Sequence, residues 1–129
     1  MIEQLIANLE SADRPSDELT RAACLCFLRR DDYSELASLL TLACSDGIEA
    51  IGSCIALTQR LLPGVRFWIN QDAFDIWTVS LSYHSNSLLA EDRERWFITC
   101  RNKSRVAFAF LAVILKSVLA TSPDSFMLE

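Results

Sequence analysis

Residues 65–70 read Val65-Arg66-Phe67-Trp68-Ile69-Asn70, and this stretch decides the fold. Val, Phe and Ile alternate with Arg, Trp and Asn, a period of two that is typical of a β-strand with one buried face. Before and after this region, apolar residues recur at the 3.6-residue spacing of amphipathic helices. The change of period from 3.6 to 2 and back predicts an α+β domain.

Two further strands are expected after this one. Residues 74–81 are rich in the β-forming residues Phe, Ile, Trp, Thr and Val, and residues 96–100 make a third short strand. The strands follow one another closely in the chain, so neighbours should pair antiparallel. We therefore expect one antiparallel three-stranded sheet over about residues 65–101, packed by helices in an αβα-sandwich-like arrangement.

Helices are expected on both sides of this sheet region in the sequence. Their apolar spacing and end signals place them at approximately residues 2–11, 16–30, 34–43, 47–62 and 105–120. The fourth has the clearest start, since Asp46-Gly47-Ile48-Glu49 is interpreted as a capping box with Asp46 as the N-cap. The last is apolar on several faces and should be the most buried. These two helices are expected to pack against the sheet.

The composition describes one folded domain over residues 1–129. Hydrophobic residues make up 51% of the chain and the mean hydropathy is +0.22, which excludes a disordered protein. The longest uncharged apolar run, residues 106–115, is shorter than the ~20 residues that a bilayer requires. The N-terminus has no basic region followed by an apolar run. We expect a cytoplasmic protein without membrane contact.

Residue types that carry catalysis or bind metals are sparse. The three glycines are scattered, so there is no Gly-rich phosphate loop, and the spacing of the five cysteines is typical of buried, reduced thiols. His84 is the single histidine and lies in a polar segment. We expect no cofactor, no metal and no enzymatic activity. A small hydrolase-type enzyme that uses His84 and nearby Asp and Glu residues is the open alternative.

Charge is distributed unevenly along the chain. The net charge is −5, and residues 1–62 hold 5 Lys+Arg against 10 Asp+Glu, so all of it belongs to this half. An acidic chain is a poor candidate for direct nucleic-acid binding, because phosphates require cations. The acidic half is instead a candidate docking surface for a basic partner protein. The densest run of acidic residues follows Arg30, and the candidate partner-binding residues there are Asp31, Asp32, Tyr33 and Glu35.

Trp68 is the fifth candidate for partner binding. It lies on the strand face opposite to Phe67 and Ile69, so a sheet covered on one face only would leave it exposed. An exposed Trp near Arg is typical of binding hot spots. The alternative, in which helices cover both faces and bury the Trp residues, is left open.

Two stretches give the chain a family resemblance. The first is Ile2-Glu3-Gln4-Leu5-Ile6-Ala7-Asn8-Leu9-Glu10-Ser11-Ala12, and the second is Leu61-Leu62-Pro63-Gly64 followed by Val65-Arg66-Phe67-Trp68. They resemble the opening helix and the Trp-containing strand of small phage and prophage proteins with the phage ABA sandwich domain. The chain departs from the family pattern at Arg105, where Pro is common, and at Phe108 and Phe110, where small residues are.

The resemblance implies helix–sheet–helix layering, a bacterial cytoplasm and a phage or prophage accessory gene. It carries over no functional residue, because the family has no established activity. Together with the acidic half, it favours a small accessory protein that acts by non-enzymatic protein–protein binding. Such a protein could inhibit a host defence system, in the manner of an anti-CRISPR protein, by occupying a basic surface with carboxylates.

A second function class stays open beside the first. The apolar content can leave a patch for a homodimer, so the alternative is a structural or assembly protein of a phage that associates with itself. In either case the expected partner is a host or phage protein or a second copy of the chain.

Overall fold

The computed structural model describes residues 2–84 and 95–121. These residues form five helices and three strands. In chain order the elements are α1 (Ile2–Ser11), α2 (Asp17–Leu25), α3 (Tyr33–Ala43), α4 (Glu49–Leu61), β1 (Arg66–Gln71), β2 (Trp77–His84), β3 (Arg95–Asn102) and α5 (Val106–Thr121). The predicted α+β class and the antiparallel three-stranded sheet are confirmed.

The strands pair in the order β1-β2-β3, and both pairs are antiparallel. Gly64, at φ 84°, makes the turn between α4 and β1, a backbone conformation that costs glycine little. In the register of the sheet, Trp68 lies opposite Ser80, and Ser80 lies opposite Thr99. Residues that face one another across strands share a sheet face, so this register fixes which side chains point outward.

The second strand begins at Trp77, three residues later than the sequence predicts. The carboxylate of Asp72 accepts hydrogen bonds at Oδ1 from the backbone N–H of Phe74 (2.8 Å) and of Ile76 (3.1 Å). Asp75 adopts a positive φ of 62° within this turn. An Asp side chain that caps the following backbone favours a turn over a strand. The turn therefore includes Phe74 despite its β-forming side chain.

The start of α4 also differs from the sequence prediction. Ile48 is the N-cap and makes no side-chain cap hydrogen bond, so the capping box assigned to Asp46 and Glu49 does not form. The Asp46 carboxylate instead pairs with the guanidinium of Arg105, 59 positions away in sequence. A long-range ion pair has replaced the local cap, which short-range spacing does not reveal.

Helix α5 is the centre of the core. Its residues from Ala107 to Leu115 are all buried, including Phe108 and Phe110, which are fully buried. It packs on β2, β3, α1 and α4. This confirms the expectation that the last helix is the most buried. No helix in the described part of the chain is long and apolar enough to cross a membrane.

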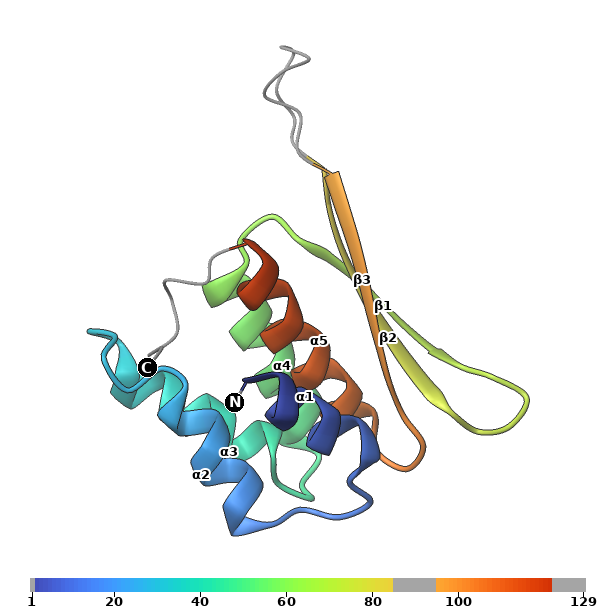
Figure 1. Ribbon diagram of the computed structural model, residues 1–129, viewed down its shortest axis with the longest axis horizontal. Coiled ribbons are helices and arrows are strands. Elements are labelled where there is room, and N and C mark those ends of the chain that lie inside the picture. The colour runs from blue at the N-terminus through green and yellow to red at the C-terminus, as the bar shows by residue number, and fades with distance from the viewer. Residues whose placement is uncertain (1, 85–94, 122–129) are drawn as a thin grey trace.

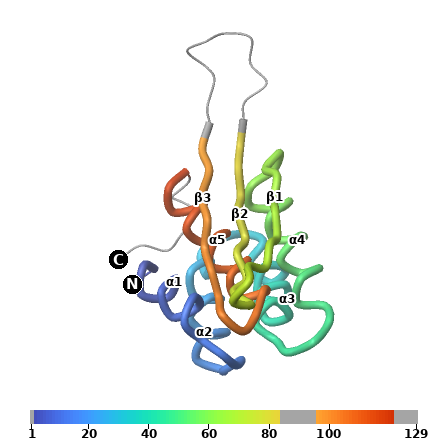
Figure 2. The backbone as a smooth tube through the Cα atoms, turned by 90° about the vertical axis from the view of Figure 1, so that its right-hand side faces the viewer, coloured from blue at the N-terminus to red at the C-terminus, as the bar shows by residue number. Residues whose placement is uncertain are grey.

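All described helices lie on one side of the sheet (Figure 1), and the strands lie in front of the helices when the molecule is viewed from the opposite side (Figure 2). On the inner face of the sheet, Val79, Leu81 and Cys100 are buried against the helices, whereas Phe67 and Ile69 of β1 are more than a third exposed. The opposite face is not covered by a helix of the described residues. Over residues 2–84 and 95–121, the helices and the sheet therefore form two layers, with the helices against one face of the sheet.

Candidate functional site

The uncovered face of the sheet is the candidate functional site, and we call it the outer face. Because side chains alternate along each strand, the register assigns every second residue of β1, β2 and β3 to it. The members of the outer face whose side chains the structure describes are Arg66, Trp68, Asn70, Thr78, Ser80, Ser82, Phe97, Thr99 and Arg101.

Two large aromatic residues lie at the middle of the outer face. Trp68 is 50% exposed and Phe97 is 65% exposed, and their ring centroids are 6.2 Å apart with a 48° angle between the planes. This distance and tilt are in the range of a favourable aromatic pair. The two rings project from the edge strands β1 and β3, and they meet above the central strand β2.

Small residues on β2 allow this meeting. Ser80 pairs with Trp68 in the register and Ser82 pairs with Phe97, and neither side chain is large enough to separate the rings. Ser80 is buried, and its hydroxyl lies 2.9 Å from the hydroxyl of Thr99 on β3. The aromatic pair therefore packs over two hydroxyl groups that already hydrogen-bond to each other.

The charge of the outer face is opposite to that of the chain. Arg66 and Arg101 are both exposed, on β1 and β3 respectively, and no acidic side chain belongs to the described members of the face. The rest is Ser, Thr and Asn. The outer face thus offers apolar area at its centre and cations on its two outer strands, a composition typical of binding hot spots.

The candidate acidic segment is organised differently from the prediction. Arg30 donates to Asp32 twice, from Nε to Oδ1 (2.9 Å) and from Nη2 to Oδ2 (3.2 Å), and Arg60 donates from Nε to the same Oδ2 (3.0 Å). Arg60 also pairs with Glu35 through its Nη2. Asp32 and Glu35 are therefore already paired with arginines, Arg30 from the α2–α3 connection and Arg60 from α4.

This arrangement has an electrostatic consequence. The hydrogen bonds from Arg30, together with those from Arg60, hold the pKa of Asp32 at about 2, below its usual value. Asp31 is exposed and Tyr33 is half-buried at the start of α3. Asp32 is therefore engaged in joining α4 to the α2–α3 connection, and Asp31 and Glu35 are its more accessible neighbours.

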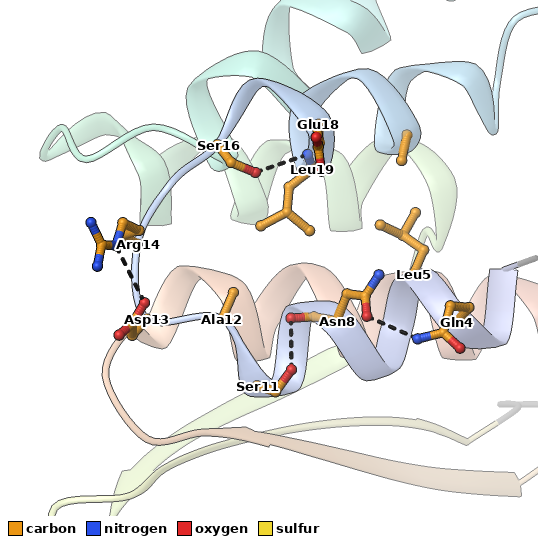
Figure 3. Close-up of a pocket in the computed structure, with 11 residues that line it drawn as sticks. Gln4, Leu5, Asn8, Ser11, Ala12, Asp13, Arg14, Ser16, Glu18 and Leu19 are labelled. Atoms are coloured by element: carbon orange, nitrogen blue, oxygen red, sulfur yellow. Dashed lines mark hydrogen bonds and ion pairs between the residues drawn. The ribbon is translucent and has the colours of Figure 1, made fainter.

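A cleft of about 670 Å³ lies between α1 and α2 (Figure 3). Its polar side chains are engaged locally. Gln4 donates to Asn8 (2.9 Å), and Ser16 accepts from the backbone N–H of Leu19 (3.2 Å) as the N-cap of α2. Asp13 and Arg14 pair with one another at 3.6 Å and are both exposed. These contacts lie within α1, at the start of α2 and between two neighbouring residues, and they do not converge on a common point.

The cysteines are free thiols that lie in or against the core. Cys44, Cys54 and Cys100 are buried, and Cys24 and Cys26 are half-buried. Burial raises the pKa of Cys26 and Cys44 to about 11 and that of Cys100 to about 12, and it raises the pKa of Cys54 further. A nucleophilic thiol needs a lowered pKa, so these thiols are suited to packing. The side chain of His84 lies outside the described residues.

The sequence predicts Trp68 as a binding residue, whereas Phe97 and the two arginines of the outer face are not among the predicted residues. The same period of two in residues 96–101 separates Trp96 and Ile98 from Phe97 and Thr99, so the signal was present. What the sequence could not supply is the register that brings Phe97 beside Trp68.

Comparison with family models, with curated proteins and with solved structures finds no match. The resemblance to phage ABA sandwich proteins therefore stays a prediction from the quoted residues.

Proposed function

We propose that this chain is a non-enzymatic binding protein that docks onto a partner protein through the outer face of its sheet. The observation that carries the proposal is the contact between Trp68 and Phe97, both exposed, on a face without a covering helix of the described residues. A water-exposed aromatic pair on a rigid sheet loses little entropy when a partner covers it, so its burial can contribute directly to affinity.

The surrounding groups indicate what the partner should present. Arg66 and Arg101 lie on the two outer strands, so a complementary partner has an apolar pocket for the rings and carboxylates at the rim. A protein fits better than a nucleic acid, because the whole chain carries a net charge of −5 and repels phosphates at long range. A phage or prophage setting, with a host defence protein as the target, follows from the family resemblance and belongs to the proposal only as its context.

The acidic segment is the second candidate surface. Asp31 and Glu35 are exposed, and they could face a basic partner while Asp32 holds the local structure. The self-associating alternative rests on the open edge of β1 and is treated below.

The experiment compares the two surfaces in one affinity purification from the cells that make the protein, followed by binding measurements with the recovered partner. Trp68→Ala and Phe97→Ala should each weaken binding by roughly tenfold or more, as hot-spot truncations do. Phe74→Ala is the matched control, because Phe74 is 81% exposed in the β1–β2 turn and lies outside the outer face. It should bind as the unchanged protein does.

Two results would contradict the proposal. One is a partner lost on combined replacement of Asp31→Asn and Glu35→Gln but retained by both aromatic variants, which would move the site to the acidic segment. The other is tight binding of a single-stranded oligonucleotide that Trp68→Ala abolishes, since the outer face would then be a base-stacking platform.

A further inference from the structure

Strand β1 forms an open edge of the sheet. All six residues, Arg66 to Gln71, are exposed, and among the described elements its substantial contacts are with β2 alone. Phe67 touches Phe110 with ring centroids 5.2 Å apart, yet Phe67 is still 38% exposed. Proteins usually protect such edges with Pro, Lys, bulges or covering segments, because an open strand pairs readily with another. β1 contains no Pro and no Lys.

The free hydrogen-bonding groups of β1 follow from the turn beside it. The N–H of Asp72 donates to the carbonyl of Ile76 at 3.1 Å, which makes this pair a hydrogen-bonded pair of the hairpin. Hydrogen-bonded and non-hydrogen-bonded pairs alternate along an antiparallel ladder. Asn70, Trp68 and Arg66 therefore bond inward to β2. The outward N–H and C=O groups belong to Phe67, Ile69 and Gln71.

We propose that β1 pairs antiparallel with β1 of a second copy of this chain, across a two-fold axis at Ile69. This register places Ile69 opposite Ile69 of the partner subunit and Phe67 opposite Gln71 of the partner subunit. All three outward-facing residues then exchange backbone hydrogen bonds, so no edge group of β1 is left without a partner. This inference is independent of the partner-binding function proposed above.

The side chains agree with this register. It sets Arg66 opposite Asp72 of the partner subunit, and the two-fold axis repeats this ion pair at the other end. Asp72 uses Oδ1 for its own turn, which leaves Oδ2 toward a second partner. A register centred on Trp68 would instead set Arg66 against Asn70 and would pair only two outward residues of β1. The Arg66–Asp72 ion pairs and the larger number of paired backbone groups therefore both favour the register centred on Ile69.

The dimer would have one continuous six-stranded sheet. A two-fold axis perpendicular to the sheet keeps the outer faces of both copies on the same side. Two Trp68–Phe97 pairs would then form one extended aromatic surface. The added contact area is small, so the association should be weak and concentration-dependent.

The test is sedimentation equilibrium of the full chain over a wide range of concentrations. We expect a reversible monomer–dimer equilibrium. Arg66→Glu sets Glu against Asp72 of the partner subunit twice, and it should raise the dissociation constant roughly tenfold or more. Lys103→Glu is the matched control, because it makes the same charge change at an exposed residue beyond β3. It should leave the dissociation constant within about twofold.

A backbone variant tests the hydrogen bonds themselves. Ile69→Pro removes an outward N–H while the β1–β2 ladder keeps its bonds, and Pro is tolerated at such edge positions. It should weaken the dimer more than Ile69→Ala, which keeps the N–H. If Ile69→Pro does not fold, Arg66→Glu and the crosslinking described next decide the proposal.

Crosslinking tests the register. Opposed Cα atoms of a hydrogen-bonded pair lie about 5.5 Å apart, within reach of a disulfide. Ile69→Cys should form a dimer on mild oxidation, whereas Gln71→Cys, which faces the same way but lies off the axis, should not. A chain that is monomeric at every concentration, an equilibrium that neither Arg66→Glu nor Ile69→Pro changes, or crosslinking through Trp68→Cys in place of Ile69→Cys would overturn the inference.

The two proposals fail separately. Arg66→Glu and Ile69→Pro test the dimer by sedimentation alone, without any partner. Phe97→Ala tests the outer face by partner binding, and it lies on β3, away from the paired edge.

Discussion

The side chain of Asn102 donates a hydrogen bond from Nδ2 to the backbone oxygen of Leu9 at 2.6 Å, across 93 positions of sequence. The same nitrogen donates to the oxygen of Ala12 at 2.8 Å. Its Oδ1 accepts from the backbone N–H of Ser104 (2.8 Å) and of Arg105 (2.7 Å). One buried amide therefore joins the end of α1 to the connection between β3 and α5.

Asn102→Ala should destabilise the fold substantially. The variant leaves two carbonyl oxygens and two backbone N–H groups without their hydrogen-bond partner, and Asn102 is only 1% exposed. We therefore expect the free energy of unfolding to fall by about 2–4 kcal/mol. Urea denaturation followed by circular dichroism measures it. Asn70→Ala, an exposed Asn on the outer face, is the control and should change stability by less than about 0.5 kcal/mol. Equal effects of the two variants would contradict this role of Asn102.

Replacement of Asp32 should change how stability depends on pH. The arginines hold its folded-state pKa at about 2, below the ordinary value of 3.8. Stabilisation from a lowered pKa is present above the ordinary value and is lost as pH falls toward the folded-state value. Asp32→Asn should therefore be less stable than the unchanged protein at pH 6, by at most about 1 kcal/mol, and the difference should shrink as pH falls from 4 to 2.

Arginine variants provide the controls for this pH dependence. Arg60→Gln removes one of the two ion-pair partners and should reduce the pH dependence in the same direction as Asp32→Asn. Arg66→Gln, on the outer face, should keep the pH dependence of the unchanged protein. Thermal unfolding at pH 6 and at pH 2.5 would reveal the difference. A gap between Asp32→Asn and the unchanged protein that stays constant over this range would argue against the ion pairs.

The thiols should react slowly in the folded protein. Cys44, Cys54 and Cys100 are at most 1% exposed, and burial raises the pKa of each, so few thiolates are present at pH 8. Titration with a thiol-reactive chromophore should show slow reaction of these three and earlier reaction of Cys24, which is half-buried. All five should react at once in denaturant without reductant. Fewer than five reactive thiols there would indicate a disulfide or a bound metal.

Ser117→Ala should stabilise the protein. The hydroxyl of Ser117 is buried in α5 and makes no hydrogen bond within the described part of the chain. Its removal should raise the free energy of unfolding by about 1 kcal/mol. Thr58→Val is the matched comparison, because the buried Thr58 hydroxyl donates to the carbonyl of Cys54 at 2.9 Å. That variant should give no such gain, and a loss of stability in Ser117→Ala would show that its hydroxyl has a partner.

The sequence was most informative where one short pattern decides the structure. The alternation in residues 65–70 located the sheet, and the all-round apolar pattern of residues 106–115 identified the buried helix. Both follow from which side of an element faces the core. Phe67 and Ile69 lie on the inner face of the sheet although all of β1 stays exposed, whereas α5 is buried on nearly every side. The exposed Trp68 follows from the same alternation.

The parts that sequence did not reveal depend on contacts between distant residues. Asp32 meets Arg60 from 28 positions away, and Asp46 meets Arg105 from 59 positions away. A charge count along the chain cannot anticipate such pairs, so the segment after Arg30 seemed more acidic than it is. The one-sided cover of the sheet likewise depends on how helices dock in space and not on their spacing in the chain.

The central place of α5 bears on the way the chain folds during its synthesis. The residues of α1 to β3 leave the ribosome before Val106–Thr121. The apolar surfaces of α1, α4, β2 and β3 are buried only when that helix has been synthesised. Until then a nascent chain holds its strands without the element that buries their inner face. Folding is therefore delayed until Val106–Thr121 has emerged, and a chain that terminates before residue 106 would expose its core to chaperones and proteases.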